Sequence, residues 1–136
     1  MDTIEINKAI VRRYVEEFIG KDDMAVFHEI IAEDYVNHTA PPNTSKGPDG
    51  VLYFFHNFLK PSFPKLEVTI HHLIGEGDLV TTYKSLHGIH EGTFMGIAPT
   101  GKKVVIDIMD IVTVRDGKIT NHWHVADWSS VIAQLQ

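Results

Sequence analysis

The spacing of hydrophobic residues changes once along this chain, from a helical period to a strand period. Ile6, Ile10 and Tyr14 are four residues apart near the start, whereas apolar and polar residues alternate from Leu66 onward. A spacing of three or four places side chains on one face of a helix, and a spacing of two places them on one face of a strand. The pattern therefore predicts helices first and a sheet afterwards.

The helical half is divided by capping residues, glycine and proline. The first predicted helix begins at a cap on Asp2 or Thr3 and stops at Gly20. The second is short, begins at Asp22 or Asp23 and carries Val26, Phe27, Ile30 and Ile31. A brief extended piece over residues 35–38 and a loop over residues 40–47 follow. The third helix is predicted from about Pro48 to Leu59, with its end at Pro61.

The second half predicts two antiparallel hairpins. Residues 66–74 and 79–87 alternate on either side of a Gly-rich turn, and residues 104–114 and 119–125 flank Asp116-Gly117. Asp-Gly between β-branched runs favours a tight turn, because both central residues of a type I′ turn need positive φ. Residues 88–101 are too long for a tight turn and predict a flap or a bulged strand.

The C-terminal hairpin carries the residue types that are typical of a chemical site. A two-residue turn would pair Ile119 with Val114 and Trp123 with Asp110, and would place Asp110, Asn121, Trp123 and Asp127 together on an otherwise apolar face. His122 and His124 would lie on the opposite face with Asp107. A longer turn or a bulge would change this sorting.

The order of elements predicts an α+β fold, in which a curved antiparallel sheet is closed by the N-terminal helices into a cone with an internal cavity. With 136 residues, of which 43% are hydrophobic, the chain suits a single domain over residues 1–136. A net charge of −6 with scattered basic residues argues against nucleic acid and anionic membranes as partners, and the absence of cysteine excludes thiol chemistry. The N-terminus lacks the features of a signal peptide, so we expect a soluble cytoplasmic protein.

Three motifs in this order resemble the SnoaL-like polyketide cyclase family, part of the nuclear-transport-factor-2-like superfamily. They are Pro99-Thr100-Gly101-Lys102, the Asp116-Gly117-Lys118-Ile119 turn, and His122-Trp123 followed by Asp127. The resemblance covers nearly the whole chain. It implies the cone fold and a cyclase or isomerase that needs no cofactor.

The resemblance also implies roles for residues. Asp127 stands at the position of the family's general acid/base, which serves an intramolecular aldol reaction of a small hydrophobic or aromatic carbonyl compound. His38 matches a histidine that is frequent after the second helix in such proteins. We expect His38, Asn121, His87 and Tyr83 to donate to a substrate carbonyl, and Trp123 and Asp110 to line the same site.

Related activities fit less well. Steroid isomerases of this superfamily place a carboxylate base where this chain has Asn37-His38. The related epoxide hydrolases need an arginine on a strand, whereas the arginines here are Arg12 and Arg13 on the first helix and Arg115 at a turn. A lyase or isomerase of the cyclase type remains favoured, and a non-catalytic module that binds a hydrophobic ligand remains the alternative.

Several residues keep a structural interpretation beside the functional one. Asp127 could instead cap a short helix that begins at Trp128, and Asp110 could be a buried structural group. His122 and His124 would hold a metal only with a third ligand such as Asp107, so we predict no metal site. The middle of the other sheet face is too apolar to be left exposed to water, so we predict that it is buried in a homodimer. This face includes Val105, Met109, Ile111, Thr82 and Glu67.

Overall fold

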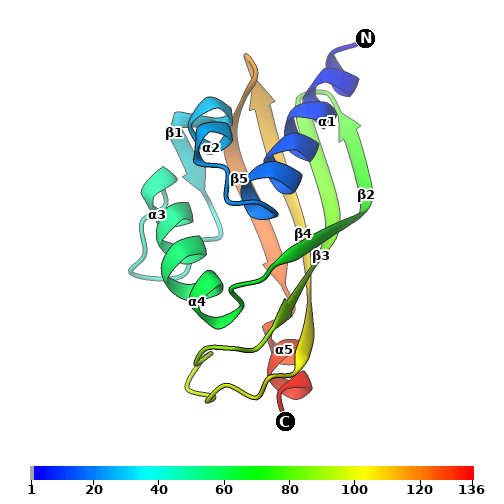
Figure 1. The fold of residues 1–136 in the computed structure, drawn as a ribbon. Helices are drawn as coiled ribbons and strands as arrows, with labels where there is room; N and C mark the ends of the chain where they lie inside the picture. The colour runs from blue at the N-terminus through cyan, green and yellow to red at the C-terminus, as the bar shows by residue number, and fades with distance from the viewer. Residues whose placement is uncertain (1) are drawn as a thin grey trace.

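Helices cover one face of a five-stranded sheet in the computed structural model, which describes residues 2–136 (Figure 1). α1 lies against β2 and β3, α2 against β1 and β5, α3 against β1, and α5 against β4. The elements follow in the order α1 Thr3–Arg13, η1 Tyr14–Ile19, α2 Met24–Ile30, β1 Ile31–Asn37, α3 Pro48–Tyr53, η2 Phe54–Leu59, α4 Lys60–Ser62, β2 Glu67–Glu76, β3 Leu79–Ile89, β4 Lys103–Arg115, β5 Lys118–Ala126 and α5 Trp128–Gln134.

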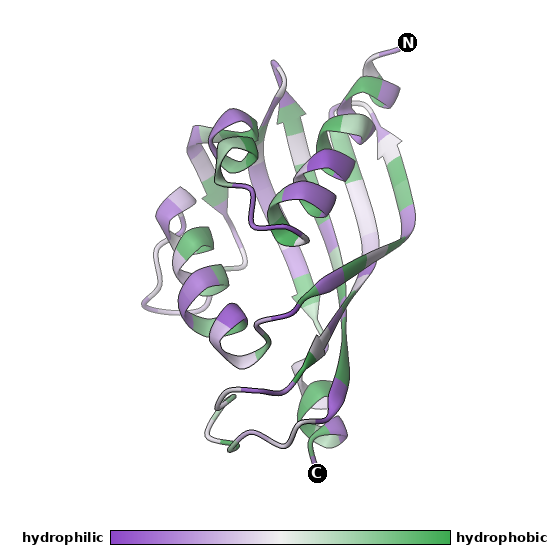
Figure 2. Ribbon diagram, in the orientation of Figure 1, coloured by the Kyte–Doolittle hydropathy of each residue, from purple (hydrophilic) through white to green (hydrophobic). Residues whose placement is uncertain are grey.

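The strands lie in the order β1-β5-β4-β3-β2. The predicted α+β class with a sheet and covering helices is confirmed. The sheet is mixed rather than purely antiparallel, because β1 runs parallel to β5, and it is not closed into a barrel. Hydrophobic and hydrophilic residues alternate along the strands, as Figure 2 shows.

Both predicted helix starts are formed by aspartate caps. Asp2 accepts a hydrogen bond from the amide of Glu5 at 2.8 Å, and Asp23 accepts from the amides of Ala25 and Val26. α1 continues into the wider turns of η1, which buries Val15 and Phe18 against the sheet. None of the helices between residues 2 and 136 combines the length and the apolar character needed to cross a membrane.

Two predicted boundaries are wrong. The second helix was expected to include Ile31, which instead begins β1, because its extended backbone pairs with Ile119 of β5. Pro61 does not end the third helix, since it lies in the first turn of α4, where a missing amide hydrogen costs no helical hydrogen bond.

The turn of the C-terminal hairpin is the predicted one, but the register beyond it is not. Asp116 and Gly117 have φ values of 51° and 77°, and Ile119 pairs with Val114. The register then shifts, so that Asn121 pairs with Thr113, and His124 rather than Trp123 pairs with Asp110. Thr120 is the extra residue of a β-bulge, and one extra residue moves every later side chain of β5 to the other face.

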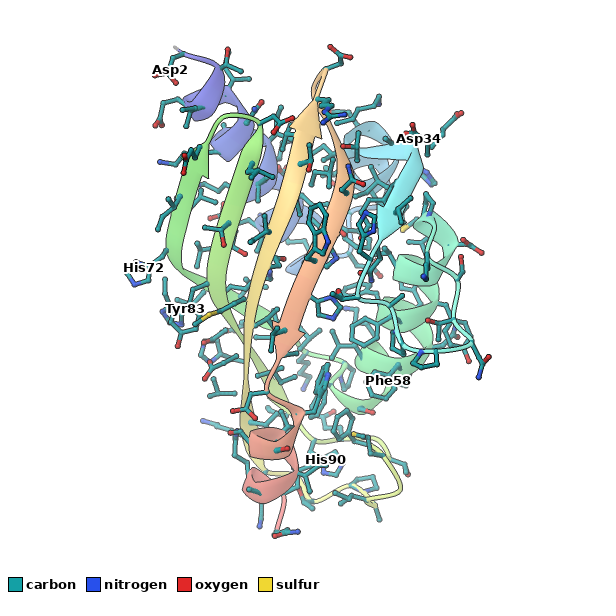
Figure 3. The ribbon with its side chains drawn as sticks, turned by 180° about the vertical axis from the view of Figure 1, so that it is seen from behind. Asp2, Asp34, Phe58, His72, Tyr83 and His90 are labelled. Atoms are coloured by element: carbon teal, nitrogen blue, oxygen red, sulfur yellow. The ribbon has the colours of Figure 1, made fainter. Side chains whose placement is uncertain are left out.

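The bulge therefore reverses the predicted faces of β5. We call the sheet surface under the helices the inner face and the opposite surface the outer face. Figure 3 looks onto the outer face, where Tyr83 and His72 project near the β2 and β3 edge. Register and alternation place the following residues on the inner face: Thr82, Lys84, Asp110, His122 and His124. They place the following on the outer face: Tyr83, His87, Val105, Asp107, Met109, Ile111, Asn121, Trp123 and Val125.

Candidate functional site

A group of hydrogen-bonded polar residues interrupts the apolar inner face. It consists of Thr82 and Lys84 from β3, Asp110 from β4, His122 and His124 from β5, and Thr39 just after β1, and we call it the inner polar cluster. Asp110 lies at its centre: Oδ2 accepts from Nζ of Lys84 at 2.7 Å, and Oδ1 accepts from the hydroxyl of Thr82. Nε2 of His122 lies 3.3 Å from the same Oδ2.

Lys84 and Asp110 form a buried ion pair. The side chains are 3% and 12% exposed, so water solvates neither charge well. Burial by itself disfavours the ionised carboxylate, but the Lys84 ammonium and the ring of His122 outweigh it and hold the pKa of Asp110 well below its ordinary value. The cluster therefore contains one positive and one negative charge in fixed positions.

His124 extends the cluster toward β1. Its ring stacks on that of His122, with centroids 5.0 Å apart and an interplanar angle of 7°. Nδ1 lies 2.7 Å from the hydroxyl oxygen of Thr39, which is also 3.0 Å from the side-chain oxygen of Asn37. Burial, with a contribution from His122, lowers the pKa of His124 to about 4, so its imidazole is neutral at pH 7.

The residues nominated for substrate binding are divided between the two faces. Asp110 belongs to the inner polar cluster, whereas His38, Asn121 and Trp123 meet on the outer side. There the His38 ring stacks on Trp123 at 4.7 Å and its Nε2 lies 2.9 Å from Oδ1 of Asn121. The substrate-binding roles predicted for His38, Asn121 and Trp123 stay predictions. The prediction that Asn121 and Trp123 share a face with Asp110 is wrong, because the bulge at Thr120 turns them to the outer face.

Tyr83 and His87 also lie on the outer face. The Tyr83 ring is 4.7 Å from that of His71, and Nε2 of His87 is 3.1 Å from the hydroxyl of Thr69. Thr82, which we expected on the outer face, points inward and bonds Asp110. The alternation along β3 thus separates Thr82 from its neighbour Tyr83.

Asp127 follows β5 and is the N-cap of α5. Its Oδ1 accepts from the amide of Ser130 at 3.0 Å, and Oδ2 has no hydrogen-bond partner within residues 2–136. The residue is exposed, so the apolar surroundings that the acid/base prediction assumed are not found in this structure. The cap and the acid/base role are compatible, since the cap uses only one of the two carboxylate oxygens.

Aromatic side chains gather around Trp128, the residue that follows Asp127 in the chain. Trp128 lies 6.1 Å from Phe54, 5.9 Å from Phe58 and 6.0 Å from Phe94, measured between ring centroids. We call these four residues the aromatic end. Phe54 is 37% exposed, so part of this apolar surface is open to a ligand.

The metal ligand set considered from the sequence does not assemble. Asp107 lies on the outer face and accepts from the hydroxyl of Ser85 at 2.6 Å, whereas His122 and His124 point inward. No cluster of three or more histidine or acidic residues suited to a metal ion occurs in the part of the chain that the structure describes.

Comparison with known proteins identifies the family. A protein-family model described as SnoaL-like polyketide cyclase matches residues 9–135. The chain belongs to the SnoaL-like polyketide cyclase family. Membership suggests a cyclase or isomerase role, and a comparison with curated protein sequences found no significant match.

Solved structures agree with this family. The proposed polyketide cyclase IdmH from Streptomyces antibioticus is 31% identical with a TM-score of 0.85, over 95% of this chain and 97% of IdmH. A protein from Bacillus cereus and one from Jannaschia, both described as proposed polyketide cyclases, are 26% and 25% identical with TM-scores of 0.81 and 0.82. The matches cover 96% and 99% of this chain, and 80% and 95% of those proteins.

Sequence reasoning missed most of the inner polar cluster. A signal was present at Lys84, because a lysine in the alternating run Val80, Thr82, Lys84, Leu86 must either break the apolar face or be paired on it. Thr39 and His124 gave no such signal. Their contact depends on the parallel pairing of β1 with β5 and on the bulge, which alternation does not reveal.

Proposed function

We propose that this SnoaL-like protein catalyses ring closure or isomerisation of a small hydrophobic carbonyl compound, with Asp127 as the proton shuttle. The observation that carries the proposal is the free carboxylate oxygen of Asp127, at the family's motif position and directly before Trp128 of the aromatic end. The other oxygen is held by the amide of Ser130, which fixes the carboxylate in one orientation.

The chemistry needs only one proton carrier. The carboxylate takes a proton from a carbon next to a carbonyl, and the resulting enolate carbon attacks a second carbonyl of the same molecule. A carbon–carbon bond forms, and the new alkoxide receives the proton back from Asp127. In an isomerisation the same proton returns at a different atom. Aromatic side chains at Phe54, Phe58 and Trp128 suit a substrate with a flat, apolar ring system.

The test separates proton transfer from helix capping. Asn caps a helix about as well as Asp but cannot carry the proton, whereas Ala does neither. We expect Asp127→Asn to keep the wild-type melting temperature and to lose catalysed exchange of the acidic protons of ethyl benzoylacetate with D2O, followed by proton NMR. Asp127→Ala should lose the exchange and also about 1 kcal/mol of stability.

A binding module without catalysis is the second candidate, and the exposure of Asp127 favours it. It predicts that the wild-type protein binds ethyl benzoylacetate but exchanges its protons no faster than buffer. It also predicts that Asp127→Asn leaves both binding and exchange unchanged. The exchange experiment therefore decides between the two functions.

We also propose that the protein acts as a homodimer through its outer face. Several large apolar side chains are exposed there, including Val125 at 75% and Met109 at 58%, with Val105, Ile111 and Trp123 beside them. A continuous apolar surface of this kind is typical of an interface between copies of one chain.

A further inference from the structure

The first residues of β4 have a neighbouring strand on only one side. Residues 103–107 pair with β3, but β5 ends where Ala126 pairs with Ile108, so the described part of the chain places no strand against their other side. α5 lies there instead, at the end of the sheet where β4 begins (Figure 1). The open edge of β4 is therefore covered by the helix that Asp127 caps.

Gln134 of α5 bonds this edge as a residue of a neighbouring strand would. Its side-chain oxygen accepts from the amide of Val105 at 2.8 Å, and its side-chain nitrogen donates to the carbonyl of the same residue at 2.9 Å. Paired residues of antiparallel strands exchange an N–H and a C=O in the same way. Two bonds to one residue also fix the plane of the Gln134 amide, because only this orientation brings each donor to an acceptor.

A series of hydrogen bonds runs from this attachment to the carboxylate of Asp127. The side-chain nitrogen of Gln134 also donates to the hydroxyl of Ser130 at 3.1 Å, and the amide of Ser130 donates to Oδ1 of Asp127 at 3.0 Å. At the other end of α5, the amide of Asp127 donates to the carbonyl of Asp107 at 3.1 Å. α5 is thus attached to the backbone of β4 at two places, Val105 and Asp107.

Apolar packing holds α5 on the sheet but gives it little orientation. Val131 and Leu135 are 0% and 4% exposed, so they anchor the helix in the core. Hydrophobic burial is not directional, and a helix of seven residues is too short to be stable by itself. Proton transfer requires a carboxylate held to within a fraction of an ångström, which directional contacts provide. Gln134 makes three of them.

Stability alone does not require this arrangement. Val105 is 40% exposed, so water can bond its N–H and C=O when no side chain does. Replacing such a water by a protein group gains little net free energy for each hydrogen bond. Water, however, supplies no fixed link between β4 and α5, and Gln134 does.

We propose that Gln134 is a positioning residue, which holds the carboxylate of Asp127 in one orientation by attaching α5 to the backbone of β4. The orientation rests on the contacts above, whereas the use of this carboxylate as a proton shuttle rests on the proposed function. Under that function, a carboxylate that is oriented before the substrate arrives transfers a proton faster, because less of the barrier is spent on arranging the groups.

The test reads the orientation of Asp127 directly by NMR. Three-bond couplings from Cγ of Asp127 to its own backbone nitrogen and carbonyl carbon distinguish a single χ1 rotamer from an average over several. Gln134→Met removes the hydrogen bonds but keeps the length of the side chain and the preference for helix. We expect the couplings of one rotamer in the wild type and averaged couplings in Gln134→Met. The amide of Val105 should also exchange with D2O at least about twofold faster in the variant.

Two further variants make the comparison sharper. Gln136→Met is the matched control, because Gln136 is exposed just beyond α5 and its substitution should change neither the couplings nor the exchange of Val105. Gln134→Glu can still accept from the amide of Val105 but cannot donate to its carbonyl, and it should average the couplings as Gln134→Met does. Both Gln134 variants should remain folded, since Val131 and Leu135 still anchor α5.

Kinetics separates positioning from stability. With ethyl benzoylacetate, Gln134→Met should lower kcat for proton exchange by up to about 10²-fold and leave KM within about twofold, because the aromatic end is unchanged. A purely structural Gln134 would lower the melting temperature and leave kcat of the folded protein at the wild-type value.

The proposal is overturned if the Asp127 couplings are averaged in the wild type, or if they are the same in the wild type and in both Gln134 variants. It is also overturned if the wild type catalyses exchange and Gln134→Met keeps the wild-type kcat. A wild type without catalysed exchange, whose couplings still change in Gln134→Met, would refute the proton shuttle and support the positioning of the carboxylate. Failure of the proposed function and failure of this inference are therefore distinguishable.

Discussion

Lys84 occupies an unusual place for a lysine, since it is 2% exposed in the middle of a strand. Its ammonium is compensated by Asp110 and by the hydroxyl of Thr82 at 3.1 Å. A buried pair of this kind contributes little net stability relative to apolar residues, but breaking it leaves a charge without a partner. The pair therefore fixes the position of the cluster more than it stabilises the fold.

Lys84→Met should lower the free energy of unfolding by about 3–5 kcal/mol, because Asp110 is then buried without its cation. Urea unfolding followed by circular dichroism measures this. Lys65→Met is the matched control, since Lys65 is 76% exposed and lies 3.9 Å from Glu91, and it should change stability by less than about 1 kcal/mol. Equal effects of the two substitutions would show that the buried pair does not hold the cluster together.

His124 should make stability depend on pH. Its pKa falls from 6.5 to about 4 on folding, so the unfolded chain binds the proton more readily and stability declines as pH falls from about 6.5 toward 4. Because part of the ring is exposed, we expect a loss of only about 1 kcal/mol over this range, which His124→Asn should remove. Urea midpoints measured from pH 7 to pH 4 test this. The control is His28→Asn, on the exposed side of α2, which should keep the pH dependence of the wild-type stability. If His124→Asn also kept that pH dependence, its assignment to His124 would be refuted.

At the scale of elements, the bulge at Thr120 decides which histidine, tryptophan and carboxylate side chains share a face. The type of each strand and the Asp116-Gly117 turn could be predicted, because period and turn chemistry are local properties. The bulge could not, since Thr120 is a β-branched residue that suits a regular strand and no glycine or proline marks the extra position.

The candidate site was predictable only in part, for the same physical reason. Asp110 was identified because a carboxylate on an apolar face is visible in the alternation of β4. His122 and His124 were assigned to the wrong face by the one-residue shift, and Lys84 was not identified. The contacts between β1 and β5 depend on tertiary packing, which no local pattern encodes.

Deleting Thr120 alone would remove the bulge and leave Asn121 paired with Thr113, whereas deleting Thr120 and Asn121 together would pair His122 with Thr113. The double deletion should therefore turn Trp123 and Val125 toward the core, with both histidines turned outward. We expect a loss of about 3 kcal/mol or more, because the core and the inner polar cluster are both disrupted. Thermal unfolding followed by circular dichroism measures the change. Thr120→Ser keeps the length of the strand and should stay within about 1 kcal/mol of wild type. A double-deletion variant that melts like wild type would contradict the faces assigned to the side chains of β5.

At the scale of the whole molecule, the two proposed functions lie in different places, and the sequence analysis likewise assigned them to opposite faces of the sheet. Asp127 and the aromatic end carry the proposed chemistry, and the outer face carries the proposed interface between two copies. Val125 and Met109 pair across β5 and β4, so they lie together at the middle of that exposed surface.

Val125→Glu and Met109→Glu should each convert a dimer to a monomer, because a charge buried in an apolar interface has no partner there. Light scattering coupled to size-exclusion chromatography gives the mass directly. Ile6→Glu on α1 is the control, since Ile6 is 45% exposed but lies on the helical side of the molecule. A wild-type protein that elutes with the mass of one chain would refute the dimer, and a dimer in both glutamate variants would place the interface elsewhere.

The central claim is that the protein moves a proton at carbon through Asp127. The most direct measurement is the rate of hydrogen–deuterium exchange of ethyl benzoylacetate in D2O with wild-type protein and with Asp127→Asn at equal folded concentration. The account predicts exchange above the buffer rate for the wild type and a loss of about 10²- to 10⁴-fold of the catalysed rate in the variant, which is the contribution typical of a general acid/base. Catalysed exchange that is equally fast in Asp127→Asn, or no catalysed exchange in the wild type, would contradict it.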